Sequence, residues 1–201
     1  MKIRSLMVPD PITITKRTTV TEAIELMKHN SIRHLPVISA QNHLEGFVTL
    51  ADMKQGLIPS MVGDLTLEDL MIKDPISVGP DDDIEIGAQF IYKYKIGGMP
   101  VVRDGRLVGI ITATDMLRTF IDMMGMLSAS SRVDVEIEEK PGAFKKATQI
   151  IHDSGGDIIN VGMTTRSAGK RTYYFRLTSC KTGGIRKSLE DEGFTVVSAM
   201  D

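Results

Sequence analysis

Two short segments of the chain combine residue types that suit the binding of a nucleotide. Each has a threonine followed three residues later by an aspartate, Thr49 with Asp52 and Thr112 with Asp115, where a strand-like apolar run gives way to a helix-like run. A hydroxyl and unpaired backbone N–H groups at a helix start suit a phosphate, and a carboxylate there can hold two ribose hydroxyls. The same spacing also fits a helix cap without a ligand, because an acid in the first turn opposes the helix dipole. The residues by themselves leave both interpretations open.

These segments are the last part of an internal duplication. Three stretches recur in the same order with related sequences: Leu6–Ile14 as Leu70–Val78, Ile32–Val37 as Ile96–Val101, and Gly46–Asp52 as Gly109–Asp115. The offset is 64 residues for the first two and 63 for the third, so the second copy has a one-residue deletion in the turn equivalent to 39–45. Such a repeat is too long for a solenoid unit, and two copies are too few for a stacked array. We therefore expect two halves of one domain, related by a pseudo-twofold axis with equivalent clefts. Such an arrangement suits binding better than a single catalytic constellation.

The composition is that of an ordinary soluble protein. The 201 residues are 42% hydrophobic and 25% charged, and the formal net charge of −2 argues against a general nucleic-acid surface. No apolar run approaches the ~20 residues that span a bilayer, and no helix-like run collects Lys and Arg on one face as a DNA-recognition helix does. Cys180 is the only cysteine, and no Cys/His spacing is that of a zinc site. We expect a cytoplasmic protein without membrane contact, direct nucleic-acid binding or a metal site.

Each copy is expected to run in the order leading segment, helix, strand, turn, strand, helix. Thr19 is the predicted N-cap of the first helix, with Glu22 completing a capping box, and Asp83 is the predicted cap of the equivalent helix. The Asp104-Gly105 pair is the strongest turn signal of the chain. The predicted helices are 19–27, 83–91 and 113–124, and the predicted strands are 35–38, 44–48, 99–102 and 107–111.

A change of character after the second copy indicates a domain boundary. Gly125 and the run Ser128–Ser131 are typical of a linker. Beyond it, the pattern predicts strands at 132–138, 157–163, 172–177 and 194–198 and helices at 143–152 and 185–192, with Phe144, Ala147, Ile150 and Ile151 facing inward. That order is the ferredoxin-like plan. We expect a mixed α/β (α+β) protein with two repeats at 1–62 and 63–127 and a further domain at 132–201.

The repeated motifs, taken in order, resemble a tandem CBS-domain pair, often called a Bateman module. The resemblance rests on the following motifs: Asp10-Pro11 and Asp74-Pro75, the strands around Leu35-Pro36-Val37 and Met99-Pro100-Val101, and the two Gly-h-h-Thr-x-x-Asp segments, where h is apolar. It covers the chain up to about residue 125, and the three motifs in order, twice, are specific. It implies clefts between the copies that sense adenosine-containing ligands such as AMP, ADP, ATP or S-adenosylmethionine, with no obligatory cofactor.

Carried over position by position, the resemblance implies roles for the matching residues. Asp52 and Asp115 would hold the ribose, and Thr49 and Thr112 would contact phosphate. The groups around the adenine would be the backbone at Thr13 and Ser77 and the segments before Pro36 and Pro100. The resemblance implies no catalytic residue.

The two copies differ just before these prolines. The first has Arg33 and His34, which could bind phosphate and add charge at lower pH, or could be two solvated residues at a strand entrance. The second has Gly97 and Gly98, which permit close approach to a base or serve only a turn. Arg118 follows Asp115 on one helical face and could supply phosphate charge to the second cleft. We expect unequal clefts, with at most one or two occupied.

Residues 132–201 resemble an ACT domain, a ferredoxin-like regulatory module that often binds amino acids at a dimer interface. The segment 141–144, Pro-Gly-Ala-Phe, matches the usual turn into the first helix, and 156–158, Gly-Asp-Ile, stands where Gly-Asn-Ile is common. Glu139 and Asp157 replace the usual Asp and Asn, which adds negative charge where an amino-acid carboxylate would bind, although backbone N–H groups near Gly142 and Ala143 could still hold it. The resemblance thus implies either an amino-acid site or a dimerisation platform without ligand. The whole combination is similar to the acetoin-utilisation AcuB type.

The leading functional hypothesis is a non-catalytic sensor. An adenosine nucleotide would shift the populations of two arrangements, and a partner such as a regulated enzyme or transporter would read the change. The alternatives are a structural dimerisation module without ligand and a nucleotide-hydrolysing enzyme, whose Mg²⁺ would need the acidic run 81–83, although acids there also suit a helix N-terminus. A homodimer is expected, with the Met-rich stretch Met116–Met126 as an apolar interface.

Overall fold

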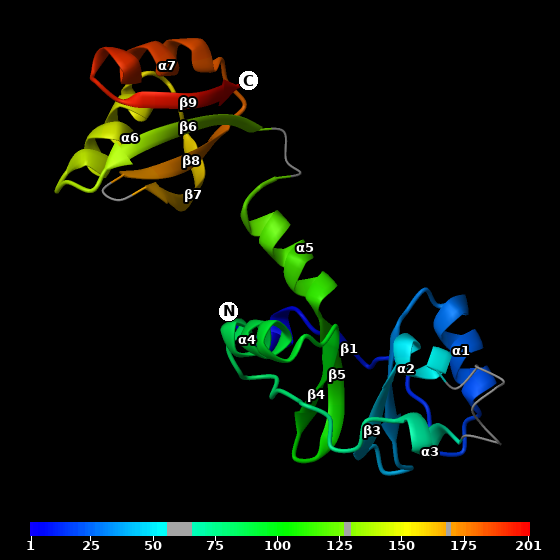
Figure 1. Cartoon of the computed structure of the whole chain (residues 1–201). Helices are drawn as coiled ribbons and strands as arrows, with labels where there is room; N and C mark the ends of the chain where they lie inside the picture. The colour runs from blue at the N-terminus through cyan, green and yellow to red at the C-terminus, as the bar shows by residue number, and fades with distance from the viewer. Residues whose placement is uncertain (56–65, 127–129, 168–169) are drawn as a thin grey trace. The chain divides into compact units, whose positions relative to one another are not determined.

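The structure divides the chain into two compact units. It is a computed structural model that describes residues 1–55, 66–126, 130–167 and 170–201. The first unit is Met1–Arg118 and the second is Thr119–Asp201. Figure 1 shows their elements in chain order. In the described ranges, no helix is both long and apolar enough to cross a membrane.

The first unit contains both copies of the duplication, and the predicted order of elements is confirmed in each. Its elements are η1 (Ile3–Ser5), β1 (Val8–Pro9), α1 (Val20–His29), β2 (His34–Ile38), β3 (Leu44–Thr49), α2 (Leu50–Gln55), α3 (Leu67–Leu70), α4 (Ile84–Tyr94), β4 (Gly98–Arg103), β5 (Arg106–Thr112) and α5 (Ala113–Met123). Helix α5 begins in the first unit and continues past Arg118 into the second. The helix predicted at 113–124 is therefore confirmed to within one residue.

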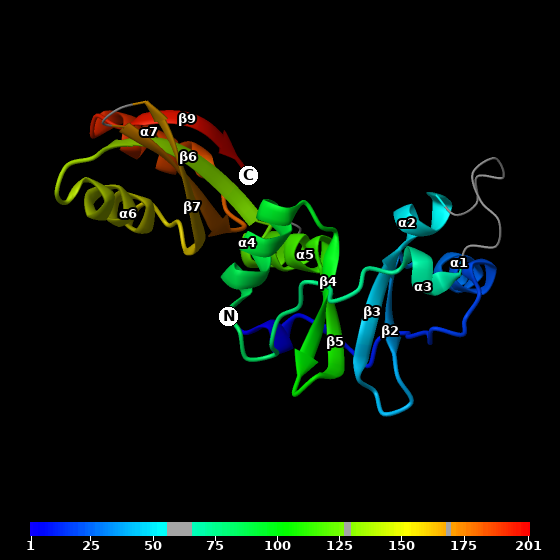
Figure 2. The same ribbon diagram turned by 60° about the horizontal axis from the view of Figure 1, so that its bottom comes forward.

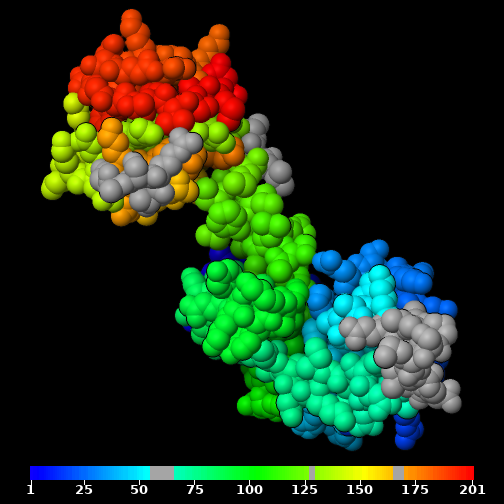
Figure 3. Space-filling model, viewed as in Figure 1, coloured from blue at the N-terminus to red at the C-terminus, as the bar shows by residue number. Residues whose placement is uncertain are grey.

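The two copies are joined through their hairpins. Strands β2 and β3 pair antiparallel in one copy, and β4 and β5 pair in the other. At the turns, Leu44 N donates to Gly105 O over 3.1 Å, and His43 bridges to Arg106. Figure 2 shows the hairpins side by side, and Figure 3 shows the same chain in a space-filling view. The predicted turn is confirmed, since Asp104 and Gly105 have φ of 52° and 75°, as a tight hairpin turn requires.

The predicted helix caps are confirmed in part. Thr19 and Glu22 form the complete capping box at the start of α1. Asp83 does occupy the N-cap position of α4, but its side chain makes no cap hydrogen bond. Its carboxylate instead forms an ion pair with Lys2 Nζ at 2.9 Å, because the N-terminal segment runs alongside this helix.

The first parts of the leading segments, 1–9 and 66–72, are exchanged between the copies, which the sequence did not predict, whereas Ile14 and Val78 bridge to Val37 and Val101 of their own copies. Strand β1 pairs with β5 of the second copy, and Ile72 in the equivalent segment bridges to Phe47 in β3 of the first. Ile3 lies fully buried in the core of the second copy, and its equivalent Leu67, 1% exposed, lies in the core of the first. Each core is therefore completed by the segment that precedes the other copy.

The exchange explains the glycine of each Gly-h-h-Thr-x-x-Asp motif. A Cβ at Gly109 would lie 2.6 Å from the sulfur of Met7, and a Cβ at Gly46 would lie 2.7 Å from the sulfur of Met71. A Cβ at either position would force the methionine to shift and would also lie 3.0 Å from Val8 O or 3.2 Å from Ile72 O, so glycine lets the exchanged segments pack this closely.

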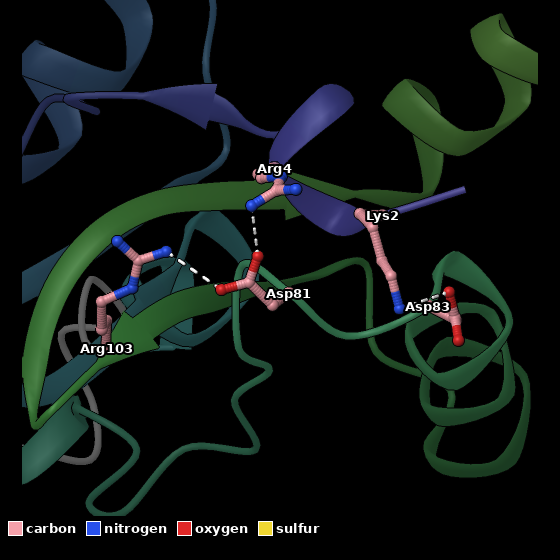
Figure 4. Close-up of polar contacts among 5 residues, drawn as sticks. All are labelled: Lys2, Arg4, Asp81, Asp83 and Arg103. Atoms are coloured by element: carbon pink, nitrogen blue, oxygen red, sulfur yellow. Dashed lines mark hydrogen bonds and ion pairs between the residues drawn. The ribbon is translucent and has the colours of Figure 1, made fainter.

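Ion pairs on the surface also hold the N-terminal segment to the second copy (Figure 4). Arg4 and Arg103 both contact Asp81, at 2.6 and 3.2 Å, and Lys2 contacts Asp83. These side chains are about half exposed, and exposed ion pairs add little stability because solvent and salt screen them. Burial of an isoleucine side chain contributes about 1.5–3 kcal/mol, so Ile3 is the main anchor of this segment.

The second unit is a four-stranded antiparallel sheet with two helices on one face. Its elements are β6 (Ser130–Glu138), α6 (Ala143–Asp153), β7 (Ile158–Ser167), β8 (Lys170–Thr178), α7 (Thr182–Asp191) and β9 (Thr195–Met200), and the strand order is β7-β8-β6-β9. The predicted order strand, helix, two strands, helix, strand is confirmed. The core is formed by Val133, Val135 and Ile137 of the central strand β6 against Ile151 and Leu189 of the helices.

Three details of this unit differ from the prediction. Ser130 and Ser131, expected in a linker, begin strand β6, and the rest of that serine run lies outside the described residues. Helix α7 begins at Thr182, three residues early, because the Asp201 carboxylate accepts hydrogen bonds from both Thr182 N and Oγ1 at 2.8 Å. Phe144, expected to face inward, is 41% exposed, with its ring 5.1 Å from that of Tyr173.

Candidate functional site

A cavity in the first unit is lined by residues of both copies. Its volume is about 430 Å³, within the range of roughly 300–1,000 Å³ typical of small-molecule sites. The first copy contributes its leading segment and the start of β2, and the second contributes the end of β5 and the first turn of α5. The lining residues are Val8, Asp10, Pro11, Ile12, Ser31, Ile32, Arg33, His34, Ile110, Thr112, Thr114 and Asp115. Apolar walls with a few convergent polar groups are the usual make-up of a ligand site.

Thr112 and Asp115 form a capping box at the edge of this cavity. Asp115 Oδ2 accepts from Thr112 N at 2.9 Å and from Thr112 Oγ1 at 2.6 Å, and Asp115 N donates back to Thr112 Oγ1 at 3.2 Å. Thr49 and Asp52 make the same three bonds at the start of α2. The cap interpretation of the motif is therefore correct in both copies, and a ligand would have to share these groups with the cap.

A third pair shows that the motif alone does not make a site. Thr66 and Asp69 have the same spacing and the same three hydrogen bonds at the start of α3, but neither lines the cavity. What distinguishes Thr112 and Asp115 is that they line a cavity to which the first copy also contributes.

His34 connects the two copies at the back of the site. Its ring stacks on that of Phe47 with centroids 5.7 Å apart, and a Cβ on Gly97 would lie only 2.9 Å from its Nε2. The glycine of the second copy therefore leaves room for the imidazole of the first, which gives a physical reason for the divergence between the copies. Burial, and secondly Arg33, lower the pKa of His34 below its ordinary value, against the opposing effect of Asp52 and Asp115. The imidazole is thus neutral at pH 7, and His34 adds charge only in acid.

The structure brings four of the predicted site residues together: Arg33, His34, Thr112 and Asp115 line the cavity. The other predicted residues do not line it: Thr13, Pro36, Thr49, Asp52, Ser77, Gly97, Gly98, Pro100 and Arg118. Pro36 and Pro100 are buried inside β2 and β4, and Arg118 is exposed on α5 and is not brought to the cavity. Thr49 and Asp52 are the repeat equivalents of Thr112 and Asp115, and the glycine pair is the equivalent of Arg33 and His34. A second cleft at these positions stays a prediction.

Sequence reasoning missed several lining residues, of which Asp10 is the most polar. Asp10 has φ of 46° and its repeat equivalent Asp74 has φ of 51°, a left-handed conformation that few non-glycine residues adopt. Ser31 in the cavity and its equivalent Lys95 share the same feature, with φ of 54° and 57°. Backbone strain of this kind gathers at functional sites. The available signal was the recurrence of Asp-Pro in both copies.

The acidic run 81–83 offers no cluster for a catalytic metal. Asp81 pairs with Arg4 and Arg103, Asp83 pairs with Lys2, and Asp82 Oδ2 accepts from Gly79 N at 2.7 Å in a turn. Within the described part of the chain, no group of three or more His, Cys, Asp or Glu side chains is placed to hold a metal ion. The acids of this run are thus engaged in ion pairs and in a turn.

Fold and site together define a duplicated α/β binding module with a ligand-sized cavity between its copies. A family model described as the CBS domain matches residues 3–58 and 67–122, more than half of the chain. The protein therefore belongs to the CBS-domain family and carries a tandem CBS pair.

Similar solved structures agree with this assignment. A Vibrio cholerae protein assigned to acetoin utilisation (AcuB) is 31% identical with a TM-score of 0.56, covering 63% of this chain and 94% of that one. The CBS pair of protein MJ0100, in complex with 5′-methylthioadenosine and S-adenosyl-L-methionine, is 30% identical with a TM-score of 0.56, covering 60% and 95%. CBSX2 in complex with AMP is 28% identical with a TM-score of 0.54, covering 60% and 96%. Related CBS pairs thus bind adenosine ligands.

Among curated proteins, an inosine-5′-monophosphate dehydrogenase of Korarchaeum cryptofilum is 36% identical over 116 residues. The match covers 57% of this chain and 23% of that enzyme. The chain therefore spans about a quarter of the length of this relative.

Proposed function

We propose that this protein is a non-catalytic regulatory sensor that binds an adenosine-containing ligand in the cavity between its two copies. One observation carries the proposal: Thr112 and Asp115 of one copy and Arg33 and His34 of the other line the same cavity of about 430 Å³. The related CBS pairs that hold AMP, S-adenosylmethionine or 5′-methylthioadenosine support an adenosine ligand. AMP, ADP, ATP and S-adenosylmethionine are the candidates.

In this proposal the capping box has two tasks. Asp115 uses Oδ2 for the cap, and the carboxylate holds the ribose hydroxyls as well. Thr112 and the first backbone N–H groups of α5 face the 5′ substituent, as helix N-termini do. The guanidinium of Arg33 lies across the cavity, and the apolar side chains of Val8, Ile12 and Ile110 cover the base.

Titration calorimetry with AMP, ADP, ATP, S-adenosylmethionine and 5′-methylthioadenosine tests this function. We expect micromolar binding of at least one ligand, about 8 kcal/mol. Asp115→Ala should weaken it by roughly 10–150-fold, because hydrogen bonds to a charged group contribute about 1.5–3 kcal/mol each. Asp69→Ala is the matched control, since it removes the same kind of cap away from the cavity. Loss of binding in both variants would mean that only helix capping was tested, and no binding in the wild type would contradict the function.

Helix α5 is the proposed route by which the ligand acts on the second unit. Its N-terminus is the Thr112 cap at the cavity, and its 11 residues span about 16 Å. Its last turn is held by the second unit, where Asn160 Nδ2 donates to Met123 O at 2.7 Å and the Met124 methyl packs on Gly162. We propose that α5 links the ligand site to the second unit, whose state a regulated enzyme or transporter would read.

Self-association belongs to the same proposal. Helix α5 is amphipathic but buries no residue, and Leu117, Phe120, Met123 and Met126 are 47–59% exposed. We propose that a second copy covers this face in a homodimer, as expected for the Met116–Met126 stretch. The second unit is proposed to be an ACT-like domain, because its strand order is the ferredoxin-like one, with either an amino acid at its helix α6 or no ligand. A cytoplasmic location and a role in acetoin utilisation stay predictions.

A scaffold without ligand is the second candidate function. It is favoured by one observation, that the three Thr-x-x-Asp pairs at helix starts, Thr49 with Asp52, Thr66 with Asp69 and Thr112 with Asp115, are complete capping boxes. The calorimetric titration separates the two, because a scaffold gives no heat with any ligand of the panel.

A further inference from the structure

The charges that line the cavity are not those of a polyphosphate site. They are the carboxylates of Asp10 and Asp115, the guanidinium of Arg33 and the imidazole of His34. Burial lowers the pKa of His34, so the imidazole is neutral at pH 7 and the formal charge of the lining is −1. Arg118, the nearest further cation on the helix, does not line the cavity. Phosphate chains are usually held by several cationic groups.

Asp10 is the group that gives this cavity its negative sign. Without it, the charges of Asp115 and Arg33 would cancel. No hydrogen bond or ion pair of its side chain occurs among the described residues, whereas Asp81 and Asp83 are each paired with a cation. Strand β1 places it firmly, since Val8 and Pro9 pair with Ile110 and Gly109 of β5 just before it.

Asp10 and Asp115 also lie beside different parts of strand β5. Asp10 follows the residue paired with Gly109, whereas Asp115 belongs to the turn that begins at Thr112. Three residues of strand separate these points, about 10 Å. Asp115 can therefore hold the ribose, while the charge of Asp10, which lines the same cavity, acts through space on the 5′ substituent near Thr112.

We propose that Asp10 is a specificity-determining residue that selects adenosine ligands with a neutral or cationic 5′ substituent over nucleotides with a phosphate chain. The inference rests on the proposed adenosine site and adds its charge class. The Asp10 carboxylate attracts a cationic sulfonium substituent and has no charge effect on a neutral thioether. It repels each additional phosphate.

Three ligands that differ in the charge of the 5′ substituent test the proposal by calorimetry. They are S-adenosylmethionine, which is cationic at sulfur, 5′-methylthioadenosine, which is neutral, and ATP, which is strongly anionic. Asp10→Asn removes the charge with almost no change of shape, and asparagine tolerates a positive φ. We expect the variant to bind ATP about fivefold more tightly and S-adenosylmethionine about fivefold more weakly, with little change for 5′-methylthioadenosine.

The repeat supplies a matched control. Asp74→Asn makes the same change at the equivalent backbone conformation, but Asp74 does not line the cavity, so all three affinities should stay as in the wild type. Tightest wild-type binding of ATP, or a shift of all three ligands in one direction by Asp10→Asn, would overturn the proposal and leave the adenosine site standing. If even 5′-methylthioadenosine does not bind, the adenosine function itself fails, and this proposal fails with it.

Discussion

The exchange of leading segments predicts that an N-terminal substitution destabilises the second copy. Ile3 is fully buried among Val78, Met99, Val101 and Ile111. Ile3→Ala removes three buried carbons, about 2.4 kcal/mol at ~0.8 kcal/mol per methylene, and the cavity left behind brings the expected cost to about 2–5 kcal/mol. The surface ion pairs of this segment cannot offset such a loss, since solvent screens exposed ion pairs and leaves them little stabilising effect.

Hydrogen exchange read by mass spectrometry is the assay, because it resolves the two copies within the full chain. We expect the amides of β4 and β5 to lose protection by a factor of roughly 30 or more, since each 1.4 kcal/mol is tenfold. Strands β2 and β3 should lose less. Ile86→Ala on α4 is the control, because that side chain is 38% exposed and its truncation should cost well under the Ile3 value. Greater loss of protection in β2 than in β4 would show that the segment packs on its own copy and would refute the exchange.

Two further predictions concern the back of the site. Gly97→Ala would place a methyl group 2.9 Å from His34 Nε2, so the imidazole must move. We expect weaker ligand binding and a His34 pKa, measured by NMR, that is closer to 6.5. Gly183→Ala, where no atom lies within 4 Å of the new methyl group, should change neither the binding nor the pKa. An unchanged His34 pKa would contradict the packing. Because the folded-state pKa of His34 is lowered, the unfolded state binds more protons once the pH falls below about 6.5, so the free energy of unfolding should fall from there toward the lowered pKa. Urea midpoints between pH 7.5 and 5.5 should show this slope in the wild type and a smaller one in His34→Asn; equal slopes would assign the effect to other groups.

The local elements could be predicted from the sequence because their signals are local. The capping box of Thr19, the turn at Asp104-Gly105 and the alternation of β6 each depend on neighbouring residues, and each is confirmed. The start of α7 was not predicted for two reasons. Gly183 and Gly184 are poor helix formers, and Asp201, which accepts hydrogen bonds from Thr182, is far away along the chain.

The exchange and the cavity could not be predicted, for a different reason. A leading segment has the same apolar pattern whether it packs on its own copy or on the other, so periodicity cannot decide between them. The sequence motif marked Thr112 and Asp115 but equally marked Thr49 and Asp52, and only the fold shows which pair lines the cavity with Asp10.

The structure of the protein with 5′-methylthioadenosine bound, determined by crystallography, tests the central claim most directly. The account predicts the ligand between the two copies, with its ribose at Asp115 and with Arg33 and His34 on the opposite wall. A ligand bound elsewhere on the chain, or contacts confined to one copy, would contradict it.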